Sequence, residues 1–99
     1  MAVKVLIKRI VPEEKAREII PLFRKMRSLA TVQQGYISGE TLKSLDSPDI
    51  FLVISSWRTS DDWEKWLLSK ERQGIQHEID ELLGGNTEYE MFHYGFSEG

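Results

Sequence analysis

Hydrophobic and polar positions along the chain follow two periods, one typical of strands and one typical of helices. Residues 3–11 are rich in β-branched side chains and end at Pro12, which cannot extend a strand ladder but suits the first turn of a helix. Residues 13–30 carry apolar side chains three and four positions apart, as an amphipathic helix does. We therefore predict a strand and then one helix, kinked rather than broken at Pro21 because the apolar stripe keeps its phase there.

The middle of the chain predicts a hairpin. Residues 36–45 alternate loosely, which places Tyr36 on the side of the strand opposite Gly39. Residues 50–57 form a nearly continuous apolar run, and the Asp-Ser-Pro-Asp sequence at 46–49 between the two runs is strong turn chemistry. We expect the two runs to be antiparallel neighbours.

The last third of the chain predicts more helix and a final strand. Residues 59–62, Thr-Ser-Asp-Asp, supply an N-cap and early acidic residues. The apolar stripe is interrupted after Ser69 and resumes as far as Leu83, which indicates one bent helix or two short ones, closed by the glycines at 84–85. Residues 88–96 are expected to form the last strand.

The order of these elements defines a fold class. It is βαββαβ, a split βαβ unit, so we predict an α+β, ferredoxin-like domain with a four-stranded antiparallel sheet and both helices on one face. A chain of 99 residues is long enough for one hydrophobic core and too short for two. We therefore expect a single domain over residues 1–99.

Two of the predicted strands are apolar on both faces, although a sheet covered by helices on one side only should alternate. The 50–57 strand has Phe51 and Val53 on one side and Ile50, Leu52 and Ile54 on the other, and the last strand has Tyr89 and Met91 on one side and Phe92, Tyr94 and Phe96 on the other. An uncovered face of this kind predicts a homodimer joined through the sheet. The alternative is a scatter of ordinary surface apolar residues.

Composition narrows the function. The formal net charge is −3 and the basic residues are scattered, so we expect no nucleic-acid partner. The chain contains no cysteine, which excludes disulfides and thiolate chemistry. Charges interrupt the N-terminal residues every few positions, which predicts neither a secretory segment nor a membrane span, and we expect a cytoplasmic protein without a membrane partner. No nucleotide-binding fingerprint or Ser-His-Asp arrangement is apparent.

Several features together resemble the antibiotic biosynthesis monooxygenase domain over nearly the whole chain. They are Tyr36 after a glycine, the hairpin ending in Trp57, the Asp-Asp-Trp-Glu-Lys-Trp run at 61–66, and His77 further along. The resemblance implies a dimeric α/β barrel with a pocket between sheet and helices in each subunit. It also implies a small-molecule monooxygenase that oxidises an aromatic, quinol-like substrate without a cofactor. A non-enzymatic binding or stress-associated dimeric module is the alternative.

The haem-degrading branch of this family is a further, less favoured reading. It uses an asparagine on the first strand, a tryptophan on the second helix and a histidine ten residues later. Trp66 matches the tryptophan, but the later position is Gln76, with His77 one place beyond, and the strand position is nearest to Lys8. We expect neither haem nor another cofactor, and no metal site, because no carboxylate lies at metal-ligand spacing from His77 or His93.

The candidate catalytic residues are Trp66, His93 and Lys8. Trp66 fits the tryptophan of the family, and His93 alternates onto a side of the last strand that could reach a pocket or a dimer seam. Lys8 and Arg9 interrupt an apolar strand, where a cation either reaches solvent at an edge, the favoured reading, or faces a cavity that accepts an anionic or phenolate group. His77 lies off the apolar helical face, which favours a solvated residue. The substrate-binding candidates are Trp66, Gln76, Phe23, Trp57 and His77.

Overall fold

The computed structural model describes residues 1–94 and confirms the predicted βαββαβ order. The second helical region is two helices, and the last strand ends at His93, earlier than predicted; Phe96 lies outside the described residues. The elements are β1 (Val3–Ile10), a 3-10 turn (Glu13–Lys15), α1 (Ala16–Ala30), β2 (Tyr36–Lys43), β3 (Ile50–Trp57), α2 (Ser60–Leu67), α3 (Lys70–Leu83) and β4 (Glu88–His93).

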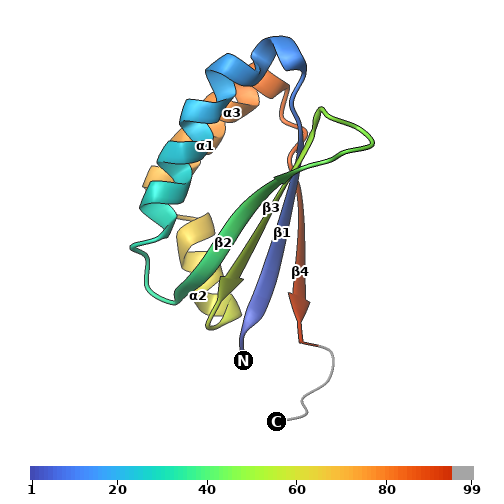
Figure 1. The fold of residues 1–99 in the computed structure, drawn as a ribbon. Coiled ribbons are helices and arrows are strands. Elements are labelled where there is room, and N and C mark those ends of the chain that lie inside the picture. The colour runs from blue at the N-terminus through green and yellow to red at the C-terminus, as the bar shows by residue number, and fades with distance from the viewer. Residues whose placement is uncertain (95–99) are drawn as a thin grey trace.

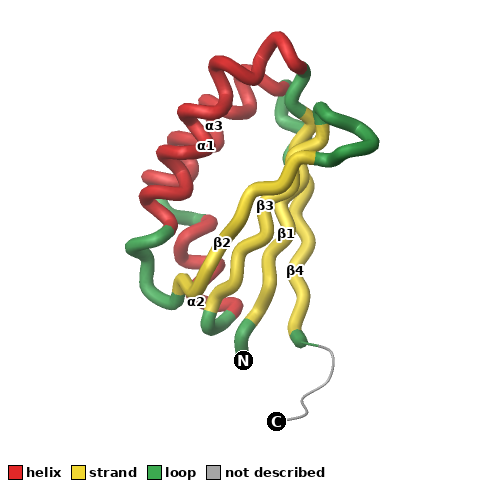
Figure 2. The backbone as a smooth tube through the Cα atoms, in the orientation of Figure 1, coloured by secondary structure: helices red, strands yellow, loops and turns green. Residues whose placement is uncertain are grey.

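The four strands form one antiparallel sheet in the order β2-β3-β1-β4. The predicted hairpin is confirmed, because β2 pairs directly with β3. Helices α1 and α3 lie side by side over one face of the sheet, and α2 lies near one end of it (Figure 1). The tube view shows the same two layers, helices on one side and strands on the other (Figure 2). The fold is therefore ferredoxin-like, with its core between the layers.

Local chemistry explains where the helices begin and end. Ser69 separates α2 from α3, because its hydroxyl donates to the Trp66 carbonyl at 2.8 Å and accepts from the Arg72 amide at 3.2 Å. Gly84, with φ of +85°, ends α3 in the left-handed conformation. α1 runs unbroken across Pro21, as predicted. The interruption near Ser69 is therefore a double cap.

One strand prediction is wrong, and a β-bulge is the reason. The register of β2 against β3 shifts between Tyr36 and Ser38, so Tyr36 pairs with Trp57 on the helix-covered face, the same face as Gly39. Its ring packs edge-on against Trp57, with centroids 5.4 Å apart. A Cβ at Gly39 would lie 2.6 Å from the Tyr36 hydroxyl, so the glycine leaves room for this ring. The bulge thus turns an aromatic side chain inward.

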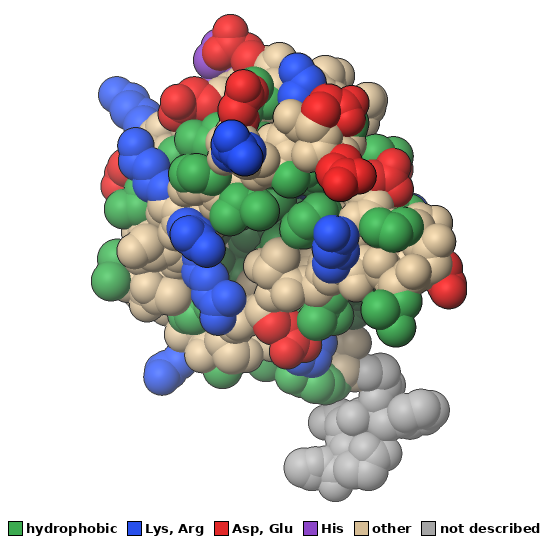
Figure 3. Space-filling view, turned by 45° about the horizontal axis from the view of Figure 1, so that its top comes forward, with side chains coloured by type: hydrophobic (Ala, Val, Ile, Leu, Met, Phe, Trp, Pro, Cys, Tyr) green, Lys and Arg blue, Asp and Glu red, His purple; other side chains and the backbone are tan. Residues whose placement is uncertain are grey.

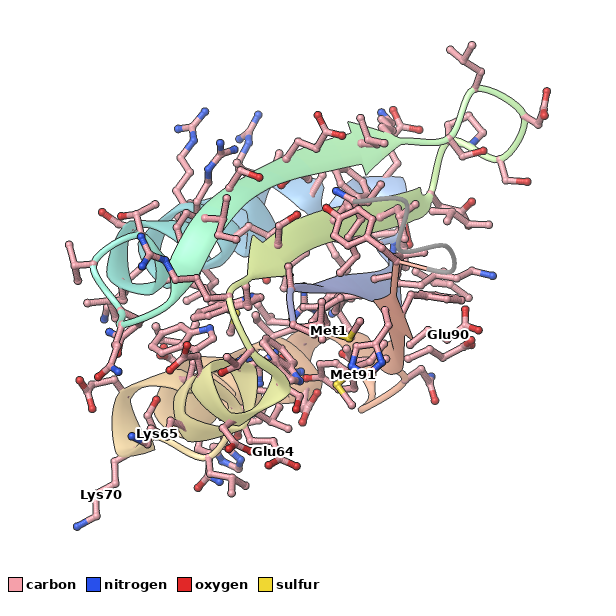
Figure 4. The ribbon with its side chains drawn as sticks, turned by 90° about the horizontal axis from the view of Figure 1, so that it is seen from below. Met1, Glu64, Lys65, Lys70, Glu90 and Met91 are labelled. Carbon is pink, nitrogen blue, oxygen red and sulfur yellow. The ribbon has the colours of Figure 1, made fainter. Side chains whose placement is uncertain are left out.

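Figures 1 and 2 show no helix over the opposite face of the sheet among residues 1–94. The predicted alternation of β3 and β4 is present in the strand register, and Glu90 and Met91 point to opposite sides of β4 (Figure 4). The uncovered face includes the partly exposed apolar side chains Leu6, Leu42, Leu52, Ile54 and Phe92.

Within residues 1–94, no helix is long and apolar enough to cross a membrane.

Candidate functional site

A cavity of about 60 Å³ lies between the sheet and the helical layer. Its walls are mainly apolar and come from β1, α1, β3 and α2, with the aromatic side chains of Phe23, Trp57, Trp63 and Trp66 among them. In the space-filling view, hydrophobic side chains surround a hollow, and Lys and Arg side chains lie beside it (Figure 3). The cavity is partly open to solvent, and mainly apolar walls with a few polar groups are a common feature of small-molecule sites.

Aromatic rings follow one another along the wall of the cavity. Trp57 contacts Tyr36 on one side and Trp63 on the other, with centroids 5.4 and 5.8 Å apart. Trp63 in turn lies 6.2 Å from Tyr89 of β4. Glu64 and Lys65, on the same helix as Trp63, point away from the sheet (Figure 4). The amphipathic α2 therefore turns its indoles toward the cavity and its charges toward solvent.

Arg9 is a buried cation on the cavity wall, only 2% exposed. Its Nη2 donates to the Gln76 side-chain oxygen at 2.8 Å, and its guanidinium lies 5.1 Å from the centroid of the Phe23 ring. Burial lowers the pKa of the Arg9 guanidinium to about 10, so the group still carries its charge at neutral pH. The strand thus delivers a desolvated positive charge to an otherwise apolar space.

Arg72 of α3 is a second buried cation on the same wall, also 2% exposed. Its guanidinium lies 5.4 Å from the Trp63 centroid and 5.3 Å from the Tyr89 centroid. Its Nη2 donates to the Tyr89 hydroxyl at 2.9 Å, and that hydroxyl donates to the Gln76 oxygen at 3.3 Å. Gln76 and Tyr89 therefore connect the two arginines through hydrogen bonds.

Polar groups between α1 and β2 mark the solvent side of the cavity. Arg27 of α1 is exposed, and its Nη2 donates to the Gly39 carbonyl at 2.9 Å. Glu40 and Thr41, both exposed, follow Gly39 along this edge. This single hydrogen bond spans the space between a helix and an edge strand, so this is where a ligand could enter with little rearrangement.

The structure brings three of the predicted site residues together and separates the others. Phe23, Trp57 and Trp66 line the cavity. Gln76 and His77 line a different hollow on the outer side of α3, although Gln76 also binds Arg9. The His77 side chain is 75% exposed, 3.6 Å from Glu81, which agrees with the helical phase that favoured a solvated histidine. His77 and Trp66 line different hollows, so the structure does not bring together the two residues that a haem site of this family would need.

The other two catalytic candidates lie outside these hollows. Lys8 is exposed, and its strand register places it on the uncovered face with Leu52 and Glu88. His93 shares the helix-covered face with Val3, but it is exposed at the edge strand β4. Neither residue is among those that line the hollows of residues 1–94.

Sequence reasoning missed the two buried arginines. For Arg9 the favoured reading was a cation that reaches solvent, and this is wrong, because the residue follows Val3, Val5 and Ile7 on the buried face of β1. The period of two along the strand was a signal that could have found it. Arg72 lies three residues before Ile75 and seven before Ile79, on the buried face of α3, so the helical period was a signal there.

The described part of the chain contains no group of three or more His, Asp or Glu side chains placed to hold a metal ion. The buried polar groups on the cavity wall are the Arg9 and Arg72 guanidiniums, which are cationic and donate hydrogen bonds, and the Ser55 hydroxyl elsewhere on the wall. Such a site can bind and orient an apolar ligand that carries an electron-rich or anionic oxygen.

The chain is thus a split βαβ, α+β domain with an aromatic-walled cavity between its layers. Residues 2–78 match the model of the antibiotic biosynthesis monooxygenase family. The chain therefore belongs to that family. A comparison with curated protein sequences finds no match.

Solved structures share the fold at low sequence identity. A conserved protein from Methanosarcina mazei is 22% identical, with a TM-score of 0.87 over 94% of this chain and 92% of the other. A variant of SnoaB, a cofactor-independent oxygenase from Streptomyces nogalater, is 16% identical, with a TM-score of 0.84 over 98% and 96% of the two chains. A putative antibiotic biosynthesis monooxygenase from Nitrosomonas europaea is 12% identical, with a TM-score of 0.86 over 99% and 94%.

Proposed function

We propose that this protein is a cofactor-free monooxygenase that oxidises an aromatic, quinol-like or anthrone-like substrate in the cavity between sheet and helices. The observation that carries the proposal is the partly open cavity walled by Phe23, Trp57, Trp63 and Trp66, which offers flat apolar surfaces to an aromatic ring. Family membership and the fold shared with a cofactor-independent oxygenase support it.

In this oxidation the protein needs only to bind the substrate and to stabilise its anion. An electron-rich phenol that has lost its proton can transfer an electron to dioxygen, and the two radicals combine to a peroxide anion. This anion takes the released proton back and becomes a hydroperoxide. Loss of water then converts a ring methylene to a carbonyl, so one substrate and one dioxygen give one ketone and one water. Arg9 and Arg72 would stabilise the anion that starts this sequence, and the indoles would orient the ring and exclude water.

Oxygen consumption tests this proposal. With anthrone as substrate, we expect the protein to consume one dioxygen per substrate faster than the spontaneous reaction. Trp66→Ala, which removes a cavity wall, should lower the rate roughly tenfold or more because the ring is no longer held in place. Leu68→Ala, at a 67% exposed position just after α2, is the matched control and should leave the rate unchanged.

Anthrone or quinol binding without any acceleration of oxygen uptake would contradict the oxygenase and favour the second candidate, a non-enzymatic small-molecule-binding module. That candidate rests on the same cavity and on the fact that one fold supports many functions. A rate equal in wild type and Trp66→Ala would show that the cavity is not where oxidation occurs.

We also propose a homodimer joined through the uncovered sheet face. The cytoplasmic location stays a prediction. The partly exposed side chains of Leu52, Ile54 and Phe92 on that face support the dimer, since a monomer would leave them in water. Light scattering coupled to size exclusion should give a mass of twice the 11.5 kDa chain. Leu52→Glu should shift it to that of one chain, whereas Leu68→Glu, away from the sheet, should not. A wild-type monomer would contradict the proposal.

A further inference from the structure

Two arginines are buried at the cavity without an acidic partner. Arg9 and Arg72 are each 2% exposed and line the same space. Within residues 1–94 the single salt bridge joins His77 to Glu81 on the surface, and neither arginine takes part in it. Buried arginines are ordinarily paired with an acid, because removing a cation from water is unfavourable. Of the acids near this cavity, Glu40 is exposed at its rim and Asp80 is hydrogen-bonded to Gln76, and within residues 1–94 neither forms a salt bridge with Arg9 or Arg72.

The guanidiniums are held in place, yet each keeps an unused donor. One terminal nitrogen of Arg9 is bound to Gln76, and one of Arg72 to Tyr89. The Nε–H groups of both arginines are buried, and no described group accepts a hydrogen bond from them. Buried donors are rarely left unpaired in folded proteins. Two such donors, on two cations at one cavity, point to a ligand that accepts hydrogen bonds and carries negative charge.

The nearest acid in this network is already engaged elsewhere. Asp80 of α3 accepts a hydrogen bond from the Gln76 side-chain nitrogen at 2.8 Å, and Thr87 accepts another from the same nitrogen at 3.0 Å. Gln76 therefore turns its oxygen to Arg9 and its nitrogen to Asp80. Gln76 is thus the positioning residue, because its amide orients Arg9 and lies between the guanidinium and the carboxylate of Asp80.

We propose that the cavity binds a small apolar carboxylic acid as its carboxylate, with Arg9 and Arg72 supplying the missing positive partners. The inference rests on the proposed function only in taking the same cavity as the substrate site, and it narrows the substrate to an aromatic acid. The carboxylate anchors the molecule against the two arginines, and its apolar part extends from there toward the edge where Arg27 meets Gly39.

The size and donor count of the site favour a carboxylate over other anions. A planar carboxylate matches the planar guanidinium and accepts several N–H groups at once. A phosphate dianion carries more oxygens than two free Nε–H donors satisfy, in walls that are otherwise mainly apolar. The free space of about 60 Å³ admits a carboxylate and the first atoms attached to it, while a larger ring extends toward the edge where Arg27 meets Gly39.

Matched pairs of neutral and anionic probes test the charge requirement. Isobutyrate and benzoate are compared with isobutyramide and benzamide, which have nearly the same shape without the charge, and with inorganic phosphate. Affinities come from titration followed by amide NMR shifts at pH 7 in low salt. We expect each carboxylate to bind roughly tenfold to a hundredfold more tightly than its amide, as hydrogen bonds to a charged group allow. Amides that bind as well as the acids, or phosphate that binds more tightly than both acids, would overturn the proposal.

Substitution of the arginines locates the binding. Arg9→Met and Arg72→Met should each abolish the preference for the carboxylate over the amide, while Arg24→Met, at an exposed position on α1, should keep it. Thermal melting verifies that each variant is folded, and Arg9→Met alone suffices if Arg72→Met does not fold. Carboxylate preference that survives in folded Arg9→Met would overturn the assignment.

The two proposals fail in different ways. Carboxylate binding that depends on Arg9, without any oxygen uptake from an aromatic acid or from anthrone, would leave the carboxylate site standing and remove the oxygenase. Anthrone oxidation that is unchanged in Arg9→Met, with no preference for acids over amides, would leave the oxygenase standing and remove the carboxylate site.

Discussion

Replacing Trp57 by alanine is expected to lower the free energy of unfolding by about 3–5 kcal/mol, because a large core side chain is lost and a hole remains. Trp57 is 1% exposed and packs between Tyr36 and Trp63. Its Nε1 also donates to the Ser55 hydroxyl at 3.1 Å, so the truncation leaves a buried hydroxyl without that donor. The free energy of unfolding of a small domain is only about 5–15 kcal/mol, so the variant should be close to unfolding.

Urea denaturation followed by the fluorescence of Trp63 and Trp66 measures this loss. Leu45→Ala, at a 96% exposed position in the hairpin turn, is the control and should change stability by no more than about 0.5 kcal/mol. If Trp57→Ala shifted the free energy of unfolding by less than about 1 kcal/mol, the indole would not be packed in solution as described.

The second large effect has the opposite sign: Arg9→Met is expected to raise stability at neutral pH. Burial lowers the pKa of Arg9 from the ordinary value of an arginine to about 10, which corresponds to a penalty of roughly 3 kcal/mol on the charged form. A lowered pKa means that the folded state binds the proton more weakly. The penalty is therefore fully present below pH 10 and is relieved only as the pH rises above 10 toward the ordinary pKa of an arginine.

Methionine removes this penalty and keeps an apolar chain of similar length in the space. The variant loses the hydrogen bond to Gln76 and the contact with Phe23, together about 1–2 kcal/mol. Gln76 keeps a donor, because the Tyr89 hydroxyl also bonds to its oxygen. The net expectation is a gain of about 1–2 kcal/mol, or a rise in Tm of roughly 4–8 °C for each kcal/mol.

Calorimetry of Arg9→Met beside Arg24→Met tests this sign, since Arg24 is exposed and should change Tm little. A carboxylate added in excess should raise the Tm of wild type and of Arg24→Met but not of Arg9→Met. A Tm that falls by several degrees in Arg9→Met would show that Arg9 serves folding, and the penalty attributed to its burial would be wrong.

Much of the fold was predictable, because its signals are local. The β-branched run before Pro12, the helical spacing across Pro21 and the turn residues at 46–49 each act within a few neighbours along the chain. These patterns predicted the element order and the hairpin, which the structure confirms. The resemblance carried by Tyr36, Trp57 and the 61–66 run predicted the family that the match over residues 2–78 shows.

The candidate site was predictable only where burial follows hydrophobicity. Phe23, Trp57 and Trp66 are apolar residues on apolar faces, and they line the cavity as predicted. The sequence predicted Lys8 as a site residue, whereas the residue that lines the cavity is its neighbour, Arg9. The period of two along β1 favoured Arg9, but the unfavourable transfer of a charge from water argued for a cation at the surface.

The sequence by itself determined which residues alternate, which faces are apolar and where helices begin and end. Tertiary structure alone decided that Tyr36 turns inward at a bulge and that two charges are buried at the cavity wall. Arg9 meets Gln76, 67 residues away, and Phe23 on a different element. The physical reason is that a buried cation needs hydrogen-bond acceptors and ring faces around it, and these partners come together only when β1, α1 and α3 pack.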